Sequence, residues 1–74
     1  MSKSLYIPRQ ETLDLVKELL ATAPPIGAYC LGAACTLAWQ QHKEPPAEVL
    51  RLVVRMESIQ GAVELCQYHG LVTE

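Results

Sequence analysis

A run of sixteen residues without a charge, residues 26–41, constrains the fold of this chain more than any other feature. The run lies between two proline pairs, Pro24-Pro25 and Pro45-Pro46. Spanning a bilayer takes about 20 consecutive apolar residues, and shorter apolar runs are more often buried helices. A longer span would have to include the first proline pair. We therefore expect a buried helix here, with a membrane-spanning helix as the alternative.

Side-chain size varies around this expected helix. A strip of small side chains contains Ala28, Gly32, Cys35 and Thr36. A bulkier strip contains Ile26, Tyr29, Cys30, Ala33 and Leu37. Small strips let helix backbones approach closely, and a helix that is apolar nearly all round must be covered nearly all round. Two neighbouring helices cover two sides, so we expect the remaining side to meet a second copy or a partner.

The rest of the chain predicts two further helices. The expected fold is an all-α, three-helix single domain over 1–74, with helices near 8–22, 26–42 and 46–69 and an extended N-terminal arm over 1–7. Apolar residues recur at spacings of three and four along the last helix: Val49, Leu52, Val53, Met56, Ile59, Val63 and Cys66. Gly61 within it predicts a bend or a close backbone approach. Gly70 predicts a left-handed helix stop, with Leu71 folding back towards Cys66.

Composition favours association. Half of the 74 residues are hydrophobic and only 19% are charged. A chain of this length buries roughly 60% of the surface that its unfolded form exposes. Small apolar-rich chains without disulfides or metals often complete their core by oligomerising. We expect a homodimer or higher oligomer, held through helix 26–42 or through the apolar face of helix 46–69.

The cysteines predict core positions rather than a metal centre. Three cysteines without a secretory signal are typical of a reducing, cytoplasmic setting. A Cys3His zinc site would need Cys30, Cys35, Cys66 and His69 as its ligands. Cys30 and Cys35 are five residues apart, so on one helix they point to different faces. We therefore expect buried free thiols, no metal and no cofactor.

The sequence carries no recognisable catalytic set. Cys66 is expected near a helix C-terminus, where the dipole raises a thiol's pKa, and reactive thiols need the opposite setting. The sequence offers no Ser-His-Asp set, paired-carboxylate cleft or glycine-rich phosphate loop. We expect a protein that is not an enzyme.

The composition instead favours a protein-interaction module that docks on a larger protein and modulates it, inhibition being the expected direction. Small accessory or phage-encoded inhibitors, including those directed against host defence systems, are frequent among such chains; this assignment rests on frequency and not on particular residues. Aromatic and arginine side chains are enriched among interface hot spots. The candidate partner-binding residues are Tyr6, Arg9, Trp39, His42, Arg51, Arg55 and Tyr68.

The alternative function is a small helical DNA-binding transcriptional regulator. A proline-bounded helix follows Trp39, as one follows the recognition helix in helix-turn-helix repressors. A recognition helix needs polar and basic residues that reach base edges, and residues 29–39 offer almost none. Lys43, Arg51 and Arg55 would contact phosphate rather than read sequence. The net charge of −2 also makes nucleic acid the less favoured partner.

Overall fold

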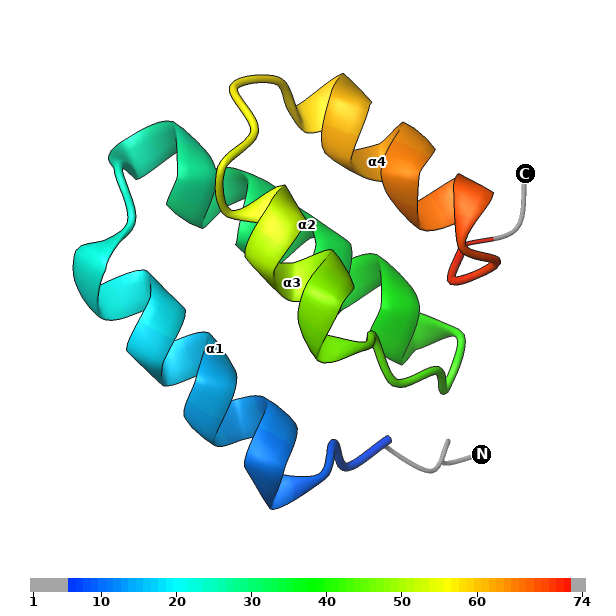
Figure 1. Ribbon diagram of the computed structural model, residues 1–74. Coiled ribbons are helices and arrows are strands. Elements are labelled where there is room, and N and C mark those ends of the chain that lie inside the picture. The colour runs from blue at the N-terminus through cyan, green and yellow to red at the C-terminus, as the bar shows by residue number, and fades with distance from the viewer. Residues whose placement is uncertain (1–5, 73–74) are drawn as a thin grey trace.

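A computed structural model describes residues 6–72, which form four helices and no strand (Figure 1). The helices are α1 (Gln10–Thr22), α2 (Pro25–Gln40), α3 (Ala47–Val53) and α4 (Ile59–Tyr68). α2 is central and packs against both α3 and α4, while α1 packs on α3. In Figure 1, α3 lies in front of α2, with α1 and α4 on either side. The all-α prediction is confirmed, and residues 1–5 of the expected arm lie outside the described residues.

The prediction of one continuous helix over 46–69 is wrong, because the chain leaves the helix between α3 and α4. The N–H groups of Arg55 and Met56 bond to carbonyls three residues back, at 3.1 and 3.0 Å, which tightens and ends α3. Ser58 is extended (φ −142°, ψ 126°) and its Oγ accepts a hydrogen bond from the Gly61 N–H at 3.2 Å. Ser58 therefore caps the N-terminus of a new helix. The bend precedes Gly61 rather than lying at it.

The break changes which residues are buried. Leu52 and Ile59, expected on the apolar stripe, are 49% and 45% exposed. The core instead takes small and medium side chains from α2, α3 and α4. Its fully or nearly fully buried members are Cys30, Leu31, Ala34, Cys35, Ala38, Val49, Leu50, Val53, Val54, Ala62, Cys66 and Leu71. A core without a fully buried aromatic ring lets the helices approach one another closely.

Gly27 marks the closest approach between α2 and the end of α3. A Cβ atom built on Gly27 would lie 2.1 Å from the carbonyl oxygen of Val54. That distance is far inside van der Waals contact, so only glycine fits. The Cys30 thiol, one turn further along α2, donates to the Met56 carbonyl at 3.7 Å. The first two turns of α2 therefore pack against the backbone of the segment that joins α3 to α4.

The turns that follow α2 and α4 meet each other. Gly70 is left-handed (φ 73°), and the Leu71 N–H bonds back to the Cys66 carbonyl at 2.9 Å, so the predicted helix stop is confirmed. Lys43, in the α2–α3 loop, donates through Nζ to the Gly70 carbonyl at 2.7 Å. His42 is the non-glycine residue with a left-handed backbone (φ 57°) among the described residues, and it follows the end of α2. None of the described helices is long and apolar enough to cross a membrane.

Candidate functional site

One side of α2 is left uncovered by the other helices. Together with the first turns of α4 it borders a shallow, open hollow of about 480 Å³. We call this the α2/α4 surface. Its residues are Ala28, Tyr29, Gly32, Ala33, Thr36 and Leu37 from α2, with Ile59 and Val63 from α4. None of these eight side chains carries a charge.

The α2/α4 surface exposes large apolar groups beside small ones. Tyr29 is 69% exposed and Ile59 is 45% exposed. Gly32 on the same surface is also exposed, and a Cβ atom built on it would meet nothing among the described residues within 4 Å. Contiguous exposed apolar side chains are typical of protein–protein contact sites. This surface is therefore the candidate functional site.

The two strips predicted on helix 26–42 do not match its buried and exposed sides. Gly32 and Thr36, from the small strip, are exposed, whereas Cys35 is buried. Cys30, from the bulkier strip, is fully buried, whereas Tyr29 and Ile26 are exposed. The buried side of α2 consists of Gly27, Cys30, Leu31, Ala34, Cys35 and Ala38. The strips describe side-chain size and not burial, and α3 and α4 cover α2 from a direction that size alone does not specify.

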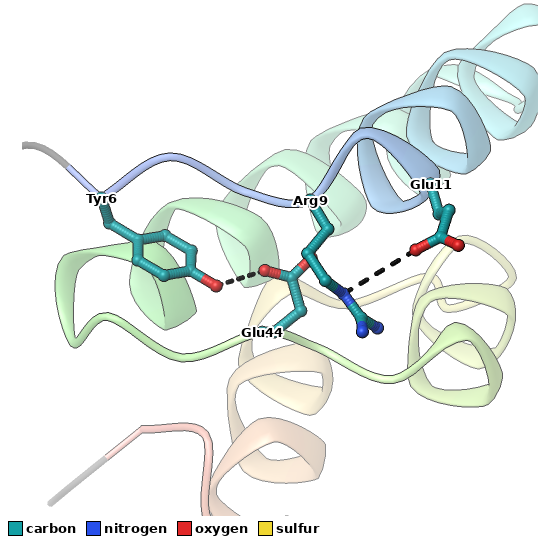
Figure 2. A network of polar contacts seen from close by, with 4 residues as sticks. All are labelled: Tyr6, Arg9, Glu11 and Glu44. Atoms are coloured by element: carbon teal, nitrogen blue, oxygen red, sulfur yellow. Dashed lines mark hydrogen bonds and ion pairs between the residues drawn. The ribbon is translucent and has the colours of Figure 1, made fainter.

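A second cluster, outside the α2/α4 surface, lies around Glu44 of the α2–α3 loop. Figure 2 shows the Tyr6 hydroxyl pointing at the Glu44 carboxylate, to which it donates a hydrogen bond. The Tyr6 ring also stacks on His42, with centroids 5.7 Å apart and planes 23° apart. Arg9 lies above Glu44, and its Nε is 4.0 Å from Oε1 of Glu11 (Figure 2). The segment before α1 is thereby held against the α2–α3 loop.

Glu44 also serves the start of α1. Arg9 is the N-cap of α1, and its side chain makes no capping hydrogen bond. Burial raises the pKa of Glu44, but the Thr12 and Tyr6 hydroxyls and Arg9 lower it by a larger amount, so the pKa lies below its usual value. The hydrogen bond to Glu44 raises the pKa of Tyr6. A carboxylate at a helix N-terminus is favoured by the helix dipole. Glu44 therefore supplies, from a distant loop, a second carboxylate near the start of α1, in addition to Glu11 in the first turn.

The seven predicted partner-binding residues do not form one surface. Tyr6, Arg9 and His42 lie together in the Glu44 cluster. Trp39 is half-buried against the core, and its indole N–H is buried without a hydrogen-bond partner among the described residues. Tyr68 is 84% exposed in the last turn of α4, with its ring edge-on to His69 at 5.3 Å. Arg51 and Arg55 are exposed on and just after α3.

None of those seven residues lines the α2/α4 surface. Sequence reasoning missed Tyr29, Ile59 and Val63 as site residues. Tyr29 was identifiable as an aromatic ring within the uncharged run. Ile59 and Val63 were assigned to a buried stripe because the break at 54–58 was not foreseen.

The three cysteines are core residues, as the sequence predicts. Cys30, Cys35 and Cys66 are free and buried. Burial raises the pKa of Cys35 to about 12, with smaller contributions from Cys66 and Glu44. Burial also raises the pKa of Cys66. These two thiols therefore stay protonated at neutral pH and act as small apolar side chains. The part of the chain that the structure describes contains no group of three or more His, Cys, Asp or Glu side chains placed to hold a metal ion.

No protein-family model, curated protein or solved structure shows significant similarity to this chain.

Proposed function

We propose that this chain is a non-enzymatic protein-interaction module that docks on a larger protein through the α2/α4 surface and inhibits it. The observation that carries the proposal is Tyr29, whose ring stands 69% exposed beside the exposed Gly32 on a helix with no charge. Large aromatic side chains next to small hollows are common anchors in protein interfaces. The fold supplies a rigid support for this anchor, because the opposite side of α2 is fully buried.

The other expected properties remain part of the proposal. The protein is cytoplasmic, forms a homodimer and belongs to the type of small accessory or phage-encoded inhibitor. Free buried thiols are compatible with a reducing compartment. An uncharged docking surface gives the complex an affinity that depends little on ionic strength.

The nucleic-acid alternative has weaker support. The basic patch proposed for it comprises Lys43, Arg51 and Arg55, and the Lys43 ammonium already bonds to the Gly70 carbonyl. Two exposed arginines on a chain of net charge −2 make a small electrostatic footprint.

Affinity capture from a lysate of the organism that makes the protein tests the docking function. The wild-type chain should retain one larger protein at high salt and after nuclease treatment. Tyr29→Glu should lose that protein, because it places a charge at the centre of an apolar contact. Tyr68→Glu is the matched control, since Tyr68 is also exposed but lies outside the α2/α4 surface. Equal capture by both variants would contradict the proposed surface, and capture that disappears with nuclease would favour the regulator.

A further inference from the structure

No contact among residues 6–72 accounts for the exposed Gly32. Glycine inside a helix is less favourable than alanine by up to about 1 kcal/mol. Gly27 is required by the carbonyl of Val54, 2.1 Å from its built Cβ, whereas Gly32 faces open space among the described residues. A glycine that the monomer does not need is suited to a backbone that approaches from outside.

The surface around Gly32 is complementary to itself. Tyr29 and Thr36 are seven residues apart, so they lie on the same side of α2, and Gly32 and Ala33 lie midway between them. If two α2 helices cross antiparallel at this midpoint, Tyr29 of each copy lies opposite Thr36 of the other. The small residues at the centre then lie opposite each other. A two-fold interface requires this kind of match, in which each large group meets a small one on the same surface.

The distribution of charge is compatible with a second copy as the occupant. Two identical surfaces bring identical charges together, and each copy has a net charge of −2. The α2 side of the surface avoids this repulsion, because residues 26–41 carry no charge. At the α4 side, Glu64 follows Val63 at the rim, where it accepts a hydrogen bond from Gln60 at 3.3 Å. A weak repulsion between such rims is screened by salt, so association should strengthen slightly as ionic strength rises.

The area that a stable dimer needs requires both helices of the α2/α4 surface. Standard interfaces bury about 800 Å² per partner. This is about one sixth of the 5108 Å² that the chain exposes. One helix of sixteen residues is only about 24 Å long, so α2 alone does not reach that area and α4 must contribute through Ile59 and Val63.

We infer that two copies of the chain pair through the α2/α4 surface about a two-fold axis, with the α2 helices antiparallel and crossing at Gly32 and Ala33. The same pairing covers the surface assigned to the larger target. Self-association and target binding therefore exclude each other; this exclusion rests on the proposed docking function, whereas the geometry of the dimer does not.

Sedimentation equilibrium from about 1 μM to about 1 mM tests the dimer, since this range spans weak to moderate affinities. The wild type should pass from monomer to dimer across the range. Tyr29→Glu should weaken association at least tenfold, and Tyr68→Glu should leave it unchanged. A monomer at every concentration, or equal association by both variants, would overturn the inference.

A cysteine at the crossing point tests the geometry. In the antiparallel arrangement Gly32→Cys lies close to the two-fold axis, so under mild oxidation it should form a disulfide with its own copy. The substitution fits the monomer, because the built Cβ of Gly32 meets no described atom within 4 Å, and the three native cysteines are buried. Tyr68→Cys is the control and should cross-link only at the background level. Equal cross-linking of the two variants would reject this crossing point.

The cross-linked Gly32→Cys dimer also separates the two proposals. It should capture less of the larger target than the same variant after reduction. Full capture by the cross-linked dimer would disprove mutual exclusion and leave the dimer standing. A protein that stays monomeric but captures a target through Tyr29 would reject the dimer and retain the docking function.

Discussion

The two sides of α2 have similar composition but different roles. The buried side contains Gly27, Cys30, Leu31, Ala34, Cys35 and Ala38, and the open side contains Ala28, Tyr29, Gly32, Ala33, Thr36 and Leu37. Each side has one glycine, and the remaining residues are mostly small or apolar. Only the buried side has a reason for its residues within the fold. The comparison teaches that an apolar helix side identifies a contact but not which molecule supplies it.

The largest expected difference between the two sides is in the stability lost when Leu31 or Tyr29 is replaced by alanine. Leu31 is fully buried, so Leu31→Ala should lower the free energy of unfolding by about 2–5 kcal/mol. Tyr29→Ala on the open side should change the stability of the monomer by less than about 0.5 kcal/mol. Urea denaturation followed by circular dichroism at low protein concentration measures both. Similar losses in the two variants would mean that the open side is part of the core.

The two glycines provide the next test. Gly27→Ala should destabilise the fold by about 1–3 kcal/mol, because the methyl group would overlap the Val54 carbonyl, which belongs to the backbone and cannot rotate away. Gly32→Ala should instead stabilise the monomer by up to about 1 kcal/mol through its higher helix propensity. Opposite signs in the same denaturation assay are the expected result. A stabilising Gly27→Ala would show that α2 and α3 are further apart than described.

A substitution of Ser58, the N-cap of α4, tests how much the cap stabilises this helix. Ser58→Ala removes the hydroxyl that accepts from the Gly61 N–H and should lower the free energy of unfolding by about 1 kcal/mol. Hydrogen exchange should quicken first at Gly61. Ser58→Asp keeps a capping oxygen and should preserve stability. If Ser58→Ala and Ser58→Asp behave alike, the cap does not stabilise α4.

The pH dependence of stability should arise at the Glu44 cluster and not at either side of α2. The folded-state pKa of Glu44 is lowered, so its stabilisation is present above the unfolded pKa of about 4.3 and is lost as the pH falls through the folded value. The folded-state pKa of Tyr6 is raised, so its contribution is present below about 10 and is lost as the pH rises beyond that value.

The urea midpoint should therefore fall between pH 5 and more acidic values in the wild type. The Glu44→Gln variant should show a smaller fall over the same range. An equal fall in the two proteins would assign the acid sensitivity to other carboxylates.

The sequence predicted well what depends on local chemistry. The proline pairs placed α1 and α2 to within two residues at each end, and Gly70 specified the final turn. The break at 54–58 was missed because its cause is tertiary. The apolar spacing continues across it, and only the Ser58 cap, three residues before Gly61, indicated a new start.

The functional sites were predicted less well than the fold. The uncharged run indicated that one side of helix 26–42 would contact a second copy or a partner, but it did not indicate which side. The hydrogen bond between Tyr6 and Glu44 joins residues 38 positions apart, and no local pattern in the sequence announces it. Residue type alone selected seven candidates, and the structure distributes them over several regions.

The small side chains of the core also affect how stability depends on temperature. Burying alanine loses almost no side-chain rotational freedom, whereas burying leucine or methionine loses more. Small side chains also release less apolar surface to water on unfolding, which lowers the heat-capacity change. The core contains Ala34, Ala38 and Ala62 together with Leu31 and Leu50. The protein should therefore have a broad, flat stability curve, with little difference between its free energy of unfolding in the cold and at moderate temperature.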